Sequence, residues 1–274
     1  MSGAFFELSG ETGRLRLLLA DTWKSRSLLW MLARKDFFVR YRRASLGVFW
    51  AAGLPLLQLI VLAVVFSRVV RIHSQVNYVT LVFAGLVPWT FFSTALASAS
   101  TAIVDGADLS TKVYFPRAVL PLVSVGSAAY GLGINVVLLV AVAAFEGVPI
   151  RASFLLLVPA AALVGLLTAA FALVLSALHV YFRDVRYVVQ AAMAVWFYAT
   201  PVFYPFRLAQ SHGLAGLLSV NPMAGVVQVF RAAVTGTDGA LGLPLWWTGG
   251  WIAALFLAAA LLYRRYDRVF VDLL

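Results

Sequence analysis

A run of basic and aromatic side chains at residues 34–50, RKDFFVRYRRASLGVFW, is the part of the sequence best suited to binding chemistry. Guanidinium groups such as those of Arg40, Arg42 and Arg43 bind phosphate and carboxylate oxygens through paired hydrogen bonds. On a helix, most of the aromatic rings here fall on one flank and most of the charges opposite, which is typical of a helix at the inner membrane interface. The arginines also have a simpler explanation, because positive charge on the cytoplasmic side sets the orientation of a span.

Residue types for catalysis or metal binding are few and far apart. The chain has no cysteine, and its three histidines lack the spacing of metal ligands. Asp105 with Asp108, and Asp184 with His179, are the pairs that a membrane-embedded transferase could use, although such loop carboxylates also cap helices. None of the three lysines lies in a G-x-x-x-x-G-K-[ST] phosphate-binding loop, so we expect no ATPase and no enzyme activity in this chain.

The elements that must position these residues are membrane spans. Of the 274 residues, 63% are hydrophobic and 12% charged, which a water-soluble fold could not bury. The net charge of +10 does not indicate nucleic-acid binding, because the basic residues lie between apolar runs. A bilayer core about 30 Å thick requires roughly 20 apolar residues per helix. Six stretches meet this condition: Ser45–Val70, Tyr78–Ser100, Ala118–Phe145, Ser153–Leu178, Tyr187–Phe203 and Leu245–Tyr263.

The distribution of charge predicts the orientation of these spans. With the amino terminus in the cytoplasm, the inner pieces hold sixteen lysines and arginines and the outer pieces five. The first residues contain no apolar core typical of a signal peptide. We therefore expect one domain, residues 1–274, with both termini cytoplasmic. Residues 1–44 form the interfacial amino-terminal part, 45–263 the six-span core and 264–274 a cytoplasmic tail.

The segment at residues 196–231 does not fit simple spanning. Pro201, Pro205 and Pro222 interrupt apolar pieces that are too short to cross a bilayer. This pattern predicts two short helices that re-enter the outer leaflet between spans five and six. An ordinary amphipathic outer loop is the alternative.

Several stretches, in order along nearly the whole chain, resemble the ABC-2 type polysaccharide permeases that export O-antigen, capsule and teichoic acid. Residues 32–72, beginning LARKDFFVRYRRASLGVFW, resemble the amino-terminal signature of that family. Residues 85–122, with Phe-Pro-Arg at 115–117, resemble its second span and the following inner connection. Further matches are HVYFRDVRYVVQ, FYATPVFYPF and NPMAGVVQVFRAAV. The chain departs from many relatives before Pro55, where it has two alanines, a glycine and a leucine.

The resemblance implies an all-α integral membrane protein with six spans, an amino-terminal interfacial helix and short re-entrant outer helices. It also implies a homodimer in the cell inner membrane, working with two copies of a separate ATPase that binds ATP and Mg. The substrate would be a polyprenyl-linked polysaccharide. An ABC-2 permease for a drug or small lipid, and a membrane-embedded glycan or lipid transferase, remain alternatives.

Three groups of residues follow as candidate sites. The predicted substrate gate consists of Arg40, Tyr41, Arg42 and Arg43, where arginines would receive the pyrophosphate of the lipid-linked glycan. Aromatic rings on spans one, two and five are predicted to line the path, because the C–H faces of sugars lie flat on such rings: Phe49, Trp50, Trp89, Phe92, Trp196, Tyr198, Phe203 and Tyr204. The inner loops are predicted to couple to the ATPase through Asp108, Lys112, Tyr114, Arg117, Asp184 and Arg186. Small residues of spans three and four fit close helix packing.

Overall fold

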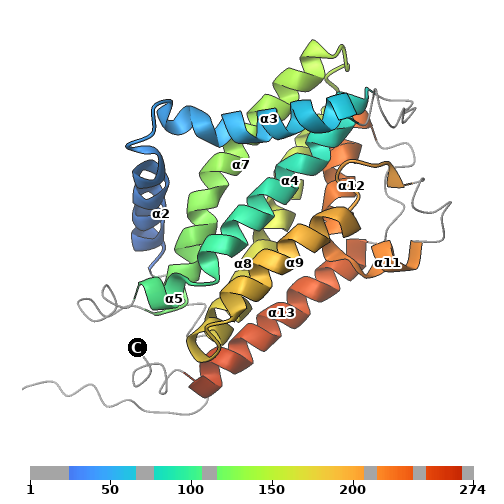
Figure 1. The fold of residues 1–274 in the computed structure, drawn as a ribbon. Helices are drawn as coiled ribbons and strands as arrows, with labels where there is room; N and C mark the ends of the chain where they lie inside the picture. The colour runs from blue at the N-terminus through green and yellow to red at the C-terminus, as the bar shows by residue number, and fades with distance from the viewer. Residues whose placement is uncertain (1–24, 66–76, 107–115, 207–214, 237–244, 267–274) are drawn as a thin grey trace, which may run out of the picture.

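The computed structural model describes residues 25–65, 77–106, 116–206, 215–236 and 245–266, and within these ranges the protein is helical and has no strand. Figure 1 shows a bundle of helices, with α2 (Arg26–Tyr41) standing at the left side of it and α3 (Trp50–Val64) lying across the others. The predicted all-helical fold is therefore confirmed.

Among the described residues, five helices are long and apolar enough to cross a membrane. They are α3 (Trp50–Val64, preceded by the 3-10 helix Gly47–Phe49), α4 (Tyr78–Ala99), α7 (Val119–Phe145), α8 (Leu157–Tyr181, preceded by the 3-10 helix Ala152–Leu156) and α13 (Leu245–Tyr266). Four of them coincide with the second, third, fourth and sixth predicted spans to within a few residues. The first predicted span is confirmed up to Val65, and residues 66–70 lie outside the described ranges.

Helix α4 forms the centre of the bundle. In its most apolar window 78% of the residues are buried, against 11–33% in the other four long helices. It packs against α3, α7 and α8 and is the only one of the five with almost no face left for lipid among the described residues. The other four long helices expose apolar side chains, as expected of membrane spans whose outer side faces acyl chains.

The fifth predicted span is shorter than expected. The corresponding helix, α9, runs Val185–Ala199 and has 15 residues, which at 1.5 Å per residue gives about 22 Å. It ends early because Thr200 is in an extended conformation and Pro201 follows it. Residues 200–205 then continue as an irregular turn rather than as helix to Phe203.

Between α9 and α13 the described residues include two further helices. Helix α11 (Ala215–Val220) is short, and α12 (Pro222–Thr235) begins with Asn221 as its N-cap and a proline in its first turn. Every residue of α12 from Pro222 to Val234 is buried, and the helix packs against α4, α8 and α13. Burial on all sides shows that α12 is packed inside the bundle.

The basic and aromatic run forms α2 (Arg26–Tyr41), which packs against α7. Ala33 and Phe37 are its buried residues, and the Phe37 ring stacks on that of Tyr130 with centroids 5.3 Å apart. Trp30 and Met31 remain more than half exposed. The helix is amphipathic as predicted, but its buried stripe is narrow and much of its apolar surface is free.

Candidate functional site

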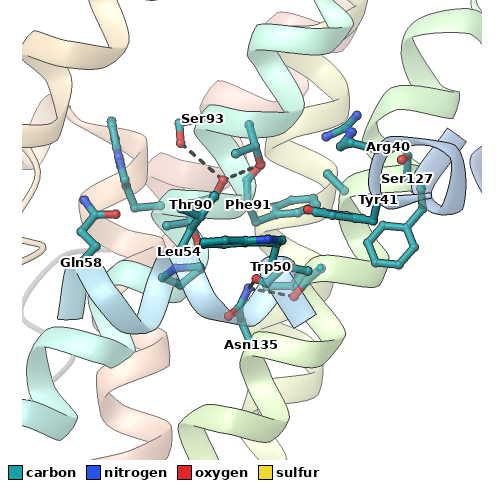
Figure 2. Close-up of a pocket in the computed structure, with 18 residues that line it drawn as sticks. Arg40, Tyr41, Trp50, Leu54, Gln58, Thr90, Phe91, Ser93, Ser127 and Asn135 are labelled. Carbon is teal, nitrogen blue, oxygen red and sulfur yellow. Dashed lines mark hydrogen bonds between the residues drawn. The ribbon is translucent and has the colours of Figure 1, made fainter. Parts of the chain in front are cut away.

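A cavity of about 280 Å³ lies where α2, α3, α4 and α7 meet. Figure 2 shows the labelled lining residues on four helices: Arg40 and Tyr41 on α2, Trp50, Leu54 and Gln58 on α3, Thr90, Phe91 and Ser93 on α4, and Ser127 and Asn135 on α7. Helical spacing explains the convergence, because Trp50, Leu54 and the more distant Gln58 are four residues apart on one face of α3.

The cavity combines rings with neutral polar groups. On α4 the hydroxyls of Thr90, Ser93 and Thr94 donate to carbonyls of their own helix, at 3.0 Å from Thr90 to Val87 and 2.6 Å from Thr94 to Thr90. Their oxygens keep lone pairs that can accept from a ligand. On α7 the cavity is lined by Ser127, Gly131 and Asn135. A site of this kind can hydrogen-bond a polar, uncharged molecule and press a ring against its apolar face.

Asn135 links two spans across this cavity. Its Nδ2 donates to the carbonyl of Gly131 at 2.9 Å and to the carbonyl of Ala51 at 3.3 Å. Carbonyls only accept, so the amide oxygen must point the other way, and it is buried without a protein partner among the described residues. The Oγ of Ser127 is buried and unpartnered in the same part of the structure.

The predicted gate residues separate in the structure. Arg40 and Tyr41 line the main cavity, whereas Arg42 lines a second hollow beneath the turn between α2 and α3. Arg43 is exposed and contributes to neither of these hollows. Arg40 also pairs with Asp36 at 3.1 Å, but both side chains are well exposed, and such a pair is weak and easily exchanged for a ligand.

The predicted path residues fall into four environments. Trp50 and Trp89 line the cavity, while Phe49 and Tyr198 are exposed on the outside of the bundle. Phe92 is fully buried, and its ring meets those of Phe171 and Trp196 edge to face at 5.7 and 5.3 Å. Phe203 and Tyr204 pack on one another in the turn after α9, with ring centroids 5.1 Å apart. Only Trp50 and Trp89 therefore share one cavity.

That turn is held by a buried arginine. Arg231 of α12 donates to the carbonyls of Leu81 at 3.3 Å, Val202 at 2.9 Å and Tyr204 at 3.0 Å. The hydroxyl of Tyr78 donates to the carbonyl of Phe203 beside it, at 2.5 Å. The sequence-based orientation counted Arg231 among the outer loop charges, and its position inside the bundle was not foreseen. Buried carbonyls outside a helix need donors from elsewhere, and Arg231 supplies them to Val202 and Tyr204.

Asn221 is a second hydrogen-bond centre, joining the end of α9 to the start of α12. Its Oδ1 accepts from the Trp196 Nε1 at 2.9 Å and from the Met223 amide at 3.0 Å. Its Nδ2 donates to the Ala199 carbonyl and to the Thr200 hydroxyl. All four positions of this amide are used, so it fixes the geometry of the segment and has no capacity left for a ligand.

The predicted coupling residues are only partly described. Asp108, Lys112 and Tyr114 lie outside the described residues. Arg117 is half-buried at the start of α7, and Asp184 and Arg186 are exposed around the first turn of α9. In Figure 1 the short helix α5 (Ala102–Asp105), the start of α9 and the end of α13 all lie at the lower left end of the bundle. The Thr101 hydroxyl donates to Asp105 at 2.6 Å, which occupies one oxygen of that carboxylate.

Sequence reasoning did not select Ser127, Gly131, Asn135 or Thr90 as site residues. A usable pattern was present, because Ser127, Gly131 and Asn135 are spaced by four on one face of α7. Among the described residues, no group of three or more His, Asp or Glu side chains could hold a metal ion.

The family model for "ABC-2 type transporter" matches residues 27–235. The chain is 32% identical to the "O-antigen export system permease protein RfbA" of Myxococcus xanthus over 219 residues, which cover 78% of this chain and 83% of that protein. It is 26% identical to the protein of the same name from Klebsiella pneumoniae, over 74% of this chain and 78% of that one. The region matched by the family model runs from α2 to α12 and thus includes all the helices that form the cavity. The chain belongs to the ABC-2 type transporter family.

Proposed function

We propose that this protein is the membrane permease of an exporter that moves a lipid-linked polysaccharide across the cell inner membrane. The relatives named for O-antigen export support the substrate class. The observation that carries the proposal is the cavity between α2, α3, α4 and α7, where Trp50 and Trp89 face hydroxyl and amide groups. Neutral hydrogen-bonding groups beside aromatic rings suit sugars better than they suit an ion or a purely apolar drug.

In this proposal the protein has six spans, and α9 is the fifth. Its length of 15 residues is compensated by the turn at residues 200–206, whose carbonyls are hydrogen-bonded internally and so can lie within the bilayer. Helices α11 and α12 re-enter the outer leaflet. The burial of α12 from Pro222 to Val234 and the buried hydrogen bonds of Arg231 support a position at membrane depth. Both chain ends are cytoplasmic in this proposal, in keeping with the excess of lysine and arginine in the inner pieces.

The substrate gate is assigned to Arg40 and Tyr41, because these two line the cavity that also contains Trp50. Arg42 and Arg43 are assigned to anionic head groups, in keeping with their exposure beside the apolar surface of α2. The path beyond the cavity runs along the aromatic rings of α4 and α9, which become accessible to substrate when the helices separate.

Energy comes from a partner ATPase, present in two copies with two copies of this chain. The inner end of the bundle, with Arg117, Asp184 and Arg186, is the proposed docking surface together with Asp108, Lys112 and Tyr114. Replacing both Asp108 and Lys112 with alanine is expected to uncouple ATP hydrolysis from export while folding persists. Unchanged export in that variant would contradict this docking site.

The proposal is tested by depleting the chain and locating the lipid-linked glycan with a lectin that cannot cross membranes. We expect the glycan to be synthesised and to accumulate on the cytoplasmic side, where the lectin reaches it only in inverted vesicles. Loss of synthesis would indicate a transferase instead. Normal glycan on the outer side would indicate a permease for another substrate, such as a drug or small lipid.

A further inference from the structure

Helix α7 presents a polar row to the cavity that the gate and path do not use. Ser127, Gly131 and Asn135 follow one another at intervals of four residues, so they lie along one face of the helix. Figure 2 shows Ser127 on the same side as Arg40 and Tyr41, and Asn135 close to Trp50. The row thus runs from the gate residues to the first aromatic ring.

Two atoms of this row are buried without a described protein partner. Ser127 is 0% exposed and Asn135 is 5% exposed, yet neither the Ser127 Oγ nor the Asn135 Oδ1 has a partner in the described structure. A buried polar atom that forms no hydrogen bond destabilises the fold, and alanine or leucine would avoid that loss. The buried Ser176 of α8 is different, since its hydroxyl contacts the Leu173 carbonyl at 3.1 Å and the Tyr263 hydroxyl at 3.3 Å. Ser127 and Asn135 are therefore arranged for something that enters the cavity.

The geometry limits what that ligand can be. The Asn135 Oδ1 can only accept, the Ser127 hydroxyl can donate or accept, and the Trp50 ring offers a flat apolar face. A ring with hydroxyl groups on its rim and C–H groups on its faces satisfies all three at once. Pockets for drug-sized ligands measure about 300–1,000 Å³, so a cavity of about 280 Å³ holds one small ring rather than a length of polymer. Arg40 lines the same cavity, so its guanidinium could bind a phosphate attached to that ring.

We propose that this cavity is a sugar-recognition subsite, in which Ser127 and Asn135 bind the sugar adjoining the pyrophosphate of the lipid-linked glycan. This inference rests on the proposed export function and adds the place where substrates are selected. Selection then depends on the first sugar and occurs before the polymer enters the path.

Gly131 provides a way to close the subsite without disturbing the fold. A Cβ built on Gly131 meets no atom within 4 Å, and the same is true of Gly133, which does not line the cavity. Leucine at position 131 would project into the subsite, whereas leucine at position 133 would project from the exposed side of α7. Gly133→Leu is therefore a matched control for Gly131→Leu.

The test is ligand binding to the full chain in lipid nanodiscs. The probes are polyprenyl diphosphates that carry one hexose, one N-acetylhexosamine or no sugar. We expect at least one sugar-bearing probe to bind several-fold tighter than the bare diphosphate. Ser127→Ala, Asn135→Leu and Gly131→Leu should each reduce this preference, by about tenfold where a buried hydrogen bond is lost, and Ser176→Ala and Gly133→Leu should retain it.

Thermal unfolding distinguishes ligand binding by Ser127 from a structural role, because a structural role predicts that Ser127→Ala is less stable than the unaltered protein. We expect Ser127→Ala to unfold at or above the temperature of the unaltered protein in the absence of probe, because no protein hydrogen bond is lost. The subsite is refuted if sugar-bearing and bare probes bind equally, or if the α7 variants keep the preference. The export proposal would survive that result, because it is decided separately by the side of the membrane on which glycan accumulates.

Discussion

Replacing Arg231 with methionine should loosen the outer end of the bundle. Methionine keeps most of the side-chain volume but removes the three hydrogen bonds to Leu81, Val202 and Tyr204. Hydrogen bonds to charged groups contribute about 1.5–3 kcal/mol each, which gives an upper limit of about 5–9 kcal/mol. Within membranes the measured values are lower, about 0.6 kcal/mol on average, which gives a lower limit of about 2 kcal/mol.

A second effect reduces the upper limit. Arg231 is 6% exposed, and burying a guanidinium without a carboxylate costs several kcal/mol, which methionine avoids. We therefore expect Arg231→Met to lower the free energy of unfolding by about 2–4 kcal/mol. Arg231→Lys should recover only part of the loss, because one ammonium group cannot span three carbonyls as the planar guanidinium does.

The assay is thermal unfolding in nanodiscs together with hydrogen exchange of the backbone amides between residues 199 and 206. The Val202 amide bonds to the Thr200 carbonyl at 2.7 Å, so its exchange reports directly on this turn. Arg183→Met, at an exposed arginine, is the control and should change stability by less than about 0.5 kcal/mol. Unchanged exchange and unchanged unfolding temperature in Arg231→Met would refute the view that this arginine holds the turn.

Three further predictions concern packing, capping and the gate. Gly85→Ala should lower the thermal unfolding temperature severely, because the new Cβ would lie 2.6 Å from the Val202 carbonyl oxygen. Gly131→Ala is the control and should show no comparable loss, because a Cβ there meets no atom within 4 Å. Asn221→Ala should lower the free energy of unfolding by about 1–3 kcal/mol through loss of the N-cap and three other bonds; a wild-type unfolding curve would contradict this. Arg40→Gln should reduce glycan export more than Arg43→Gln at equal membrane insertion, measured by surface glycan labelling, and equal export in the two would remove Arg40 from the gate.

Span positions were predictable because the bilayer imposes a length. The helix from Tyr78 and the helix to Phe145 begin and end within a residue of the expected positions. The fifth span was extended too far, since its apolar composition continues to Phe203 while the backbone leaves the helix at Thr200. Hydropathy depends only on side-chain polarity and so does not show where the backbone leaves the helix, although Pro201 indicates that the residue before it is extended.

The polar features of the interior were less predictable. Arg231 lies in a stretch that resembles an outer loop, and its burial depends on carbonyls contributed by α4 and by the turn after α9, 150 and 29 residues away in sequence. Asn135 forms an interhelical hydrogen bond, because its Nδ2 donates to the Ala51 carbonyl of α3. Its unpartnered oxygen could not be foreseen, because it depends on how α3 crosses α7.

The central claim is that ATP hydrolysis by the partner ATPase drives transport through this chain, and reconstitution in vesicles tests it directly. The chain and its partner ATPase would be placed in vesicles with a fluorescently labelled lipid-linked glycan, and the fraction of label protected from an external quencher would be followed over time. We predict ATP-dependent movement with both proteins and none with the chain alone or with an ATPase unable to hydrolyse ATP. Sustained uphill movement by the chain alone, or covalent change of the glycan in its presence, would contradict the account.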